Sequence, residues 1–388
     1  MLEIDGEVQK CFAVMRDKAI AKVQAQISRL GTGIPFMPYE GKYIDCMMPD
    51  GLSWWTNGFW PGILWQLYSA TGDALFSEAA EAVEKRLAEA LYQFEKLHHD
   101  VGFMFLPTSA ANYSVTGSKE SYVRAMHAAS LLAGRFNPTG EFIRAWNESI
   151  WAEDVSGWVI IDSMMNIPLL YWASAESRDP RFADIANRHA RTALKTLIRP
   201  DSSVNHIVSF DPTTGAFLGE VEGQGYGIGS SWSRGQAWAV YGFALTYAHT
   251  GCNEYLDTAK AVAHYCISSL CTNDWLPAVD FRSPDEPEKI DSSAAAIIAC
   301  GLLEIAEHVP VLEKRLYLEA AIRMLCTIEK KYANWDESTD GILFGSSMMY
   351  HDDRLSNTSF IYGDYFFIEA ILRLNGQGLR IWGGALVG

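Results

Sequence analysis

Apolar residues recur along most of the chain with the period of an α-helix. In 254–270 they fall every three or four positions, and 79–97 and 182–198 repeat the pattern. This spacing places the apolar side chains on one stripe, so that each helix packs one face on a core and leaves the other in water. We find no run of alternating apolar and polar residues with hairpin turns that would indicate strands. The pattern predicts a mostly α-helical protein.

A second kind of segment alternates with these amphipathic helices and is apolar nearly all round, which indicates a helix buried on every side. Several such segments lead through a short polar turn into an amphipathic helix. The stretches 68–83 and 247–262 are alike in this way, each with a Tyr followed three residues later by Thr-Gly. Such self-similarity predicts repeated helical hairpins. The apolar segments are 57–68, 121–134, 163–174, 235–249, 292–306 and 361–374.

Six buried helices, each paired with a surface helix, predict an (α/α)6 barrel, in which an outer ring of helices surrounds an inner one. An open superhelix of hairpins is the competing layout, but its inner helices would not be apolar all round. No linker rich in Pro, Gly or Ser divides the chain. We therefore expect an all-α fold in which residues 1–388 form a single (α/α)6-barrel domain.

Composition and charge exclude several classes of protein. Hydrophobic residues make up 49% of the 388, which is enough for a large core and too many for a disordered chain. The 31 basic and 47 acidic residues give a net charge of −16, so we expect no nucleic acid partner, because such binding rests on basic patches. The longest apolar stretch, 294–303, is far shorter than the roughly 18 residues that span a bilayer, so we expect no membrane partner.

The chain start and the cysteines bear on location. The start, MLEIDGEVQK, has three acids and no basic leader before an apolar run, so we expect no secretory signal. Seven cysteines are scattered without a CxxC pair, which favours reduced thiols in a cytoplasmic protein. We expect a monomer.

Polar residues gather at the ends of the apolar segments. In a closed double ring of helices, the inner-helix ends and the connecting loops at one mouth line the large cavity, so side chains with a chemical role belong there. The motifs at these positions are Ser53–Gly58, Ile161–Asp162, Ser230–Gln236 and Asp291–Ser293, with the long loops His98–Phe103 and Gly223–Gly229.

Each of these features also has a purely structural explanation. Asp162, Ser233 and Asp291 stand where helix N-caps stand, and Asp100 could cap a turn. The His-His-Asp run that ends at Asp100 lacks an HExxH motif or a second ligand pair, so we expect neither a metal nor another cofactor. The glycines of 223–229 do not fit GxGxxG and follow no predicted strand, so they favour a flexible wall that lets the backbone approach a ligand.

What remains is a pair of carboxylates, Asp100 and Asp162, beside Trp, His and Gln residues and one arginine, Arg234. A pair of carboxyl groups is the usual catalytic set of enzymes that cleave glycosidic bonds. Flat Trp rings stack on the apolar faces of sugars. Arg234 has two interpretations. It binds an inner-ring carboxylate or a backbone carbonyl, or it positions an anionic sugar at a solvent-filled mouth.

Three strings of the sequence resemble a known family. They are HHDVGF (98–103), IDSMMNIPLLYWAS (161–174) and SSWSRGQAWAVYGF (230–243), and in this order they resemble the unsaturated glucuronyl hydrolases, glycoside hydrolase family 88. The resemblance runs from about Trp54 to 360–370, which is most of the chain. It implies an (α/α)6 barrel that acts on lyase-generated oligosaccharides and releases the 4,5-unsaturated uronic acid at their non-reducing end.

The resemblance also implies a mechanism and a set of site residues. The family hydrates the C4=C5 double bond, and the resulting hemiketal opens to release a keto acid. Asp162 matches the acid/base that protonates C4 and activates water, and Asp100 matches the second carboxylate, which holds the ring hydroxyls. The matches to the substrate-contacting residues are His99, His206, Gln224, Trp232, Arg234 and Trp238, with Trp54 and Trp146 matching the stacking Trp.

One departure from the family concerns specificity. Members that prefer sulfated glycosaminoglycan fragments carry a Ser-x-x-Ser-x-Lys pattern, whereas the stretch GSSMMYHDD (345–353) lacks that Lys. This difference favours unsulfated or differently sulfated disaccharides. Three alternatives stay open. They are the sister family that removes unsaturated galacturonate from rhamnogalacturonan, a non-catalytic sugar-binding toroid, and a conventional inverting glycosidase.

Overall fold

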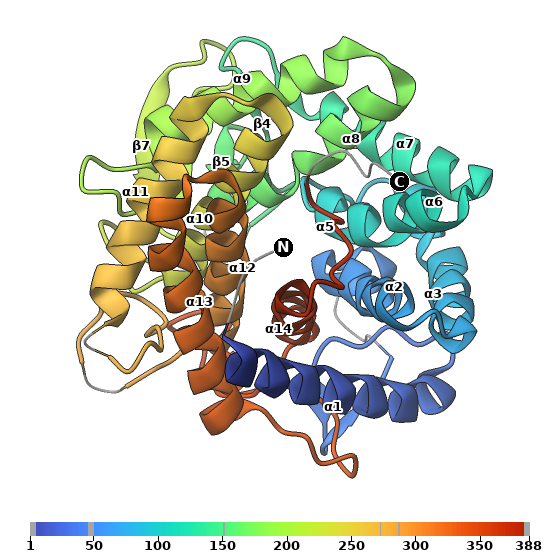
Figure 1. Cartoon of the computed structure of the whole chain (residues 1–388). Coiled ribbons are helices and arrows are strands. Elements are labelled where there is room, and N and C mark those ends of the chain that lie inside the picture. Colours follow the sequence, from blue (N-terminus) through green and yellow to red (C-terminus); the bar gives the residue numbers. More distant parts are fainter. Residues whose placement is uncertain (1–4, 46–49, 150–151, 272, 286–287, 384–388) are drawn as a thin grey trace.

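Within the described residues, six helical runs form an inner ring, which Figure 1 views end-on. This computed structural model describes residues 5–45, 50–149, 152–271, 273–285 and 288–383. The inner runs are buried nearly all round, as their apolar sequences predict. They are α2 (Phe59–Thr71), α5 (Val101–Phe105) continuing into α6 (Ala111–Thr116), α8 (Pro168–Ser177), α10 (Ser233–Thr250), α12 (Ser292–His308) and α14 (Ile361–Leu374).

Neighbouring inner helices contact one another around a closed circle. α2 packs on α14, α14 on α12 and α12 on α10, while α10 packs on α8, α8 on α5 and the turn after α5 on α2. Each inner run also packs on an outer helix, and the last pair joins α14 to a helix from the other end of the chain. The outer helices are α1 (Gly6–Leu30), α3 (Ala74–Leu87), α7 (Lys119–Gly134), α9 (Pro180–Leu197), α11 (Asn253–Leu270) and α13 (Val311–Tyr332). The predicted (α/α)6 barrel is confirmed.

One of the six predicted inner segments was wrong. Segment 121–134 lies in α7, an outer helix whose buried residues form a single stripe. The inner run of that hairpin is α5, a π turn over 106–110 and α6. Residues 101–112 are fully buried. Pro107 lies within this run, so its pattern does not resemble one regular helix.

The structure also contains short strands, which the sequence pattern did not predict. β5 (Trp158–Ile160), β6 (Ile207–Phe210) and β7 (Phe217–Val221) form an antiparallel sheet in that order, with Trp158 opposite Ser209 and Ile160 opposite Ile207. All three residues of β5 are buried, so no alternation marks it in the sequence. Two hairpins add β1 (Pro38–Tyr39) with β2 (Lys42–Tyr43) and β3 (Phe136–Asn137) with β4 (Phe142–Ile143).

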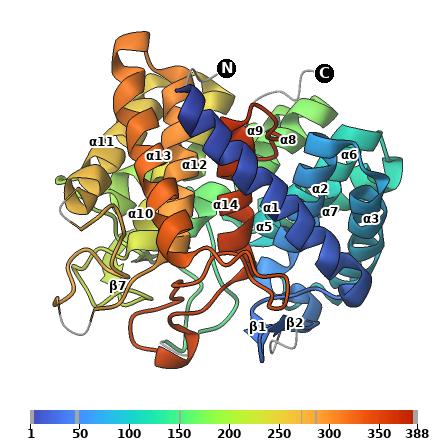
Figure 2. The same cartoon turned by 60° about the horizontal axis from the view of Figure 1, so that its bottom comes forward.

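The strands and long loops gather at one end of the barrel. Figure 2 shows β1, β2 and β7 together with long connections below the helices. Beyond the paired strands β5 and β6, Ile161 N–H donates a hydrogen bond to His206 O at 3.1 Å. This bond places Asp162, the next residue, close to His206. The glycine run 223–229 follows β7, against expectation. Nucleotide-binding loops follow a parallel strand of a βαβ unit, so an antiparallel strand still argues against one.

Aromatic side chains fill the interior of the ring. The ring of Phe103 lies 5.1 Å from that of Trp238, which lies 5.5 Å from Phe366, and Phe366 stacks at 5.9 Å on Trp382. These side chains are buried, with exposed fractions of 2% or less. The barrel is therefore a packed core beneath its mouth and not a channel.

No helix in the described part of the chain is long and apolar enough to cross a membrane. The cysteines in the described ranges are free thiols, namely Cys11, Cys252, Cys266, Cys271, Cys300 and Cys326. Cys46 lies outside those ranges.

Candidate active site

A cavity of about 480 Å³ opens where the inner helices begin. It lies among the residues that precede or start α2, α5, α8, α10 and α14. Seven of the ten residues proposed for the site line it, namely Trp54, Asp100, Trp146, Asp162, Gln224, Trp232 and Arg234. The structure therefore brings together side chains that are far apart in the sequence.

The other three proposed residues lie directly behind the cavity wall. His99 Nε2 lies 3.4 Å from Asp100 Oδ1, and His206 Nε2 lies 3.7 Å from Asp162 Oδ2. Trp238 lies on α10, and its ring contacts that of Phe103. His99 and His206 are therefore neighbours of the two acids. Trp238 belongs to the aromatic core below and also acts on Asp162, whose pKa burial raises and the Trp238 indole N–H lowers.

Helix capping explains one of the three acids. Asp291 is the N-cap of α12 and accepts a hydrogen bond from Ser293 N–H at 3.1 Å. Asp162 lies inside a 3₁₀ turn over 161–165 and so is not an N-cap. Asp100 occupies the N-cap position of α5, but its side chain accepts no capping bond. Ser233 is the first residue of α10, and the N-cap is Trp232. Capping does not account for Asp100 or Asp162.

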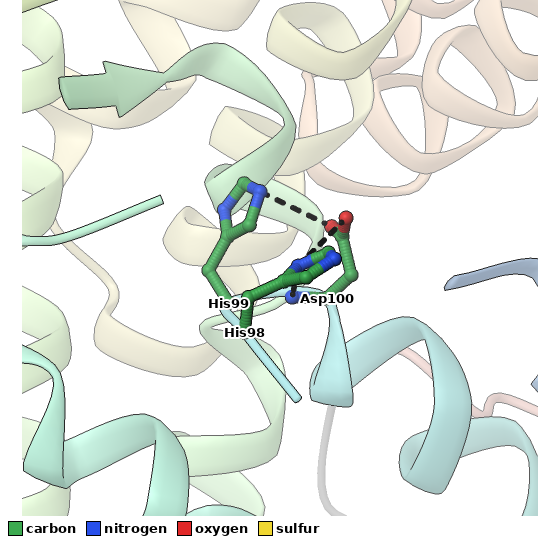
Figure 3. A group of neighbouring side chains, drawn as sticks. All are labelled: His98, His99 and Asp100. Carbon is green, nitrogen blue, oxygen red and sulfur yellow. Dashed lines mark hydrogen bonds and ion pairs between the residues drawn. The ribbon is translucent and has the colours of Figure 1, made fainter. Parts of the chain in front are cut away.

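Asp100 sits in a cluster with the two histidines that precede it (Figure 3). His98 Nδ1 lies 3.5 Å from its Oδ2. Burial and the charge of Asp162 raise the pKa of Asp100 well above its usual value, while a bond from Asn166 and the charge of Arg135 oppose this rise. Burial lowers the pKa of His98 to about 3 and that of His99 well below 6.5, so both rings are neutral.

The same cluster is the one group of possible metal ligands within the described residues. It offers three donor atoms within 4.8 Å of one another, all from consecutive residues. Structural zinc sites take four protein ligands and catalytic ones three with an open position. Asp100 also accepts a hydrogen bond from Asn166. We interpret the group as a cluster of polar side chains packed around Asp100, and the expectation that the site needs no metal stays a prediction.

Asp162 is the acid best suited to donate a proton near neutral pH. Burial raises its pKa to about 7, against the opposing charge of Arg234. Its Oδ2 is buried and has no hydrogen-bond partner in the protein. A buried carboxyl with one unoccupied oxygen can therefore hold a proton and present it to a ligand.

The orientation of His206 follows from its neighbours. Its Nδ1 accepts a bond from Gln224 N–H at 3.0 Å, so in the neutral ring Nε2 carries the proton. Burial lowers the pKa of His206 to about 3, which keeps the ring neutral. A side chain at Gly223 would clash with this ring, so the chain needs a glycine there. The Nε2–H group is thereby directed towards Asp162.

The side chain of Arg234 is buried in an ion pair with Asp291, and it also lines the cavity. The expected solvent-filled surroundings were wrong, because its side chain is only 1% exposed. One guanidinium nitrogen binds Asp291 Oδ2 at 2.6 Å and Ser347 O at 2.7 Å, and the other binds Met348 O. The interpretation of Arg234 as the partner of an inner-ring carboxylate is the one that the structure supports.

Several buried polar atoms of the site have no partner in the protein. Because buried polar groups are nearly always hydrogen-bonded, such a cluster indicates that water or a ligand completes it. Other such atoms lie elsewhere in the described part of the chain, but seven belong to residues proposed for the site. They are both ring nitrogens of His99, Oδ2 of Asp162, Nε2 of His206 and the indole nitrogens of Trp54, Trp232 and Trp238.

A second cavity, of about 790 Å³, shares Glu95 and Asn147 with the first. Two arginines of its wall bind backbone carbonyls: Arg135 binds those of residues 144 and 145, and Arg144 binds that of Trp146. These bonds hold the loop that carries Trp146 to the first cavity. We therefore place the chemistry in the first cavity, beside the two acids.

Several residues that line the cavity were not proposed as site residues from the sequence, although some of them stand in the motifs named above. Trp55, His98, Met348 and Met349 also line the cavity. Asn166 is fully buried and binds Asp100, and its signal in the sequence is a lone amide within the apolar segment 163–174. The remaining lining residues are Asp50, Glu95, Lys96, Asn147 and Glu148.

Comparison with known proteins decides the family. The model of Glycosyl Hydrolase Family 88 matches residues 36–363. The chain belongs to glycosyl hydrolase family 88. It is therefore a glycoside hydrolase, and the predicted family is confirmed.

Relatives of this family-88 chain agree with the assignment. It is 36% identical over 333 residues to the unsaturated glucuronyl hydrolase of Bacillus sp. (strain GL1), covering 84% of this chain and 88% of that one. It is 36% identical over 324 residues to the unsaturated chondroitin disaccharide hydrolase of Streptococcus pyogenes serotype M1, covering 82% and 80%. The crystal structure of unsaturated glucuronyl hydrolase from Bacillus sp. GL1 has a TM-score of 0.88 at 32% identity, covering 95% of this chain and 99% of that one.

The pKa of Asp162 predicts how activity depends on pH. A proton donor is lost as pH rises through its pKa, so kcat/KM should fall with rising pH through about 7. The measurement is kcat/KM from about pH 5 to about pH 9 in buffers of constant ionic strength. A profile that stays flat across neutrality would show that Asp162 does not donate the proton.

Proposed function

We propose that this glycoside hydrolase is an unsaturated glucuronyl hydrolase, which releases the 4,5-unsaturated uronic acid from the non-reducing end of lyase-generated oligosaccharides. The observation that carries this proposal is the pair of acids, Asp100 and Asp162, that line one cavity beside imidazole and indole nitrogens with no hydrogen-bond partner in the protein. One acid is a proton donor near neutral pH. The names of its relatives support the same activity.

The chemistry is hydration of the C4=C5 double bond. The Asp162 carboxyl donates its proton to C4, which leaves an oxocarbenium-like centre at C5. The resulting carboxylate takes a proton from water while the water oxygen bonds to C5, so the same residue is regenerated. The hemiketal at C5 then opens, and the keto acid separates from the shortened sugar. His206 Nε2–H, 3.7 Å from Asp162 Oδ2, is placed to orient the water or the acid.

The substrate is an anion, and the cavity must accept it in a protein of net charge −16. Residues that line the cavity precede or start inner helices such as α2, α8 and α10, so the positive ends of these helix dipoles lie near it and favour an anion. The indole rings of Trp54, Trp146 and Trp232 line the same cavity and offer flat faces to the planar part of the sugar. These features support binding of an unsaturated uronate.

We further propose that unsulfated disaccharides are preferred. Met348 and Met349 line the cavity in the stretch where the Lys of the sulfate-associated pattern is missing. The acids Asp50, Glu95 and Glu148 line it as well. The thioethers of Met348 and Met349 offer a sulfate group no positive charge, unlike the missing Lys, and the lining acids outnumber Lys96.

Domain organisation, oligomeric state and location are properties of the whole chain. We propose one catalytic domain over residues 1–388, because the hairpin that closes the ring joins α1 and α14 from its two ends. We propose that the chain acts as a monomer. The free thiols of the described cysteines support a cytoplasmic location.

An ultraviolet assay tests the function. The unsaturated acid absorbs in the ultraviolet because its double bond is conjugated with the carboxylate, so hydration bleaches it. We expect bleaching of lyase-generated disaccharides, faster for unsulfated than for sulfated chondroitin fragments, with heparin, hyaluronan, gellan and pectin fragments completing the panel. Bleaching of rhamnogalacturonan fragments alone would favour the sister activity.

Two other outcomes would overturn the proposal. A disaccharide that binds and is recovered unchanged would indicate a non-catalytic sugar-binding protein. Release of reducing sugar from saturated substrates would indicate a conventional inverting glycosidase, since a hydration mechanism cannot act on them.

A further inference from the structure

Asn166 contacts both acids of the site. Its Nδ2 donates to Asp100 Oδ1 at 2.9 Å and to the backbone oxygen of Asp162 at 3.1 Å. The side chain is fully buried, at 0% exposure, so these bonds are shielded from water. It lies four residues after Asp162, on the last turn before α8. One amide group therefore links the loop of Asp100 to the turn of Asp162.

Two further contacts fix the orientation of this amide. Asn166 Oδ1 accepts a bond from Phe103 N–H at 2.8 Å, so the other end of the amide, which can only donate, must face Asp100. Gly102 packs directly on Asn166, and a Cβ there would lie 2.5 Å from Asn166 Cα and 2.6 Å from its Oδ1. The HHDVGF string thus keeps a glycine where the Asp100 loop must approach this asparagine.

The two bonds distinguish the acids from each other. An N–H donor stabilises the charged form of the carboxyl that accepts it. Asn166 is such a donor to Asp100 Oδ1, and its bond acts to lower the pKa of Asp100 against burial and the charge of Asp162, which raise it. Two buried carboxyls that sense each other's charge titrate as a pair, and one proton is shared between them at intermediate pH. The Asn166 bond therefore shifts the shared proton away from Asp100 and towards Asp162, whose Oδ2 has no hydrogen-bond partner in the protein.

We propose that Asn166 is a positioning residue that holds Asp100 in place and directs the proton shared by the two acids to Asp162. This inference rests on the proposed function, in which Asp162 is the proton donor. Asn166 itself acts through the acids, since its amide is bound to Asp100, to the Asp162 backbone and to Phe103.

The test compares Asn166→Ala with the matched control Asn112→Ala. Asn112 is also a buried amide, 3% exposed, whose Nδ2 donates to the buried carboxylate of Glu84 at 2.6 Å, away from the cavity. Both variants should lose thermal stability. For Asn166→Ala alone we expect kcat to fall at least tenfold and the basic limb of the pH profile to move down by about one pH unit, because Asp162 loses its proton earlier.

A readout without substrate separates this inference from the proposed function. Carboxyl ¹³C NMR gives the titration of Asp100, identified by its loss in Asp100→Asn, and we expect it to move to higher pH in Asn166→Ala. Asn166→Asp keeps the side-chain volume and the acceptor for Phe103 N–H, and should show the same loss of kcat if the alanine variant does not fold.

An unchanged Asp100 titration, or equal kcat losses in the Asn166 and Asn112 variants, would overturn the inference. A wild-type enzyme that bleaches no disaccharide would instead refute the function, and the titration would still decide the role of Asn166.

Discussion

Asp162→Asn is expected to abolish nearly all turnover while the protein stays folded. The amide has the same shape as the carboxyl but cannot cycle a proton, and loss of general acid/base catalysis alone lowers rates by about 10²–10⁴. Asp162 Oδ2 has no partner in the protein, so the substitution breaks no bond at that atom. The measurements are the initial rate of bleaching at saturating substrate and the melting temperature.

Asp364→Asn is the matched control for that experiment. Asp364 is also buried, at 2% exposure, but it accepts bonds from Tyr43 Oη and from the N–H groups of Ile342 and Leu343, outside the cavity. We expect it to lower stability and leave the rate per folded molecule unchanged. Wild-type activity in Asp162→Asn would move the role of proton donor to another group, with Asp100 the next candidate.

Arg234→Ala should damage both stability and activity. The guanidinium is paired with Asp291, which is 0% exposed, and removal of one partner of a buried ion pair costs about 3–5 kcal/mol because the other charge is left uncompensated. The same change frees the carbonyls of Ser347 and Met348, and Met348 and Arg234 both line the cavity. We therefore expect a large drop in melting temperature and at least about a tenfold loss of kcat/KM.

Arg234→Lys separates charge from geometry. Lysine keeps the charge beside Asp291 but has no planar fork to reach Asp291 and both carbonyls at once. It should recover part of the stability and little of the kcat/KM. An unchanged melting temperature for Arg234→Ala would show that the Arg234–Asp291 pair contributes nothing to the fold.

The sequence alone was sufficient for the class of fold and for proposing the two acids. Segments 235–249, 292–306 and 361–374 are long and uninterrupted, so their all-round apolar pattern predicted the inner helices α10, α12 and α14. The acids were recognisable because they stand in strings specific to one family, at the ends of apolar segments. Periodicity is a local property, and a single chain displays it without any knowledge of its contacts.

Tertiary structure alone decided which side chains meet and which are buried. The inner run at 101–116 has no regular pattern, and β5 and β6 became visible only through their pairing. Arg234 and Asp291 are 57 residues apart, and Asp100 and Asn166 are 66 apart, yet each pair is bonded. Burial of Arg234, the raised pKa of Asp162 and the role of Asn166 all depend on such contacts, because desolvation and hydrogen bonding arise from whichever distant segments the fold brings together.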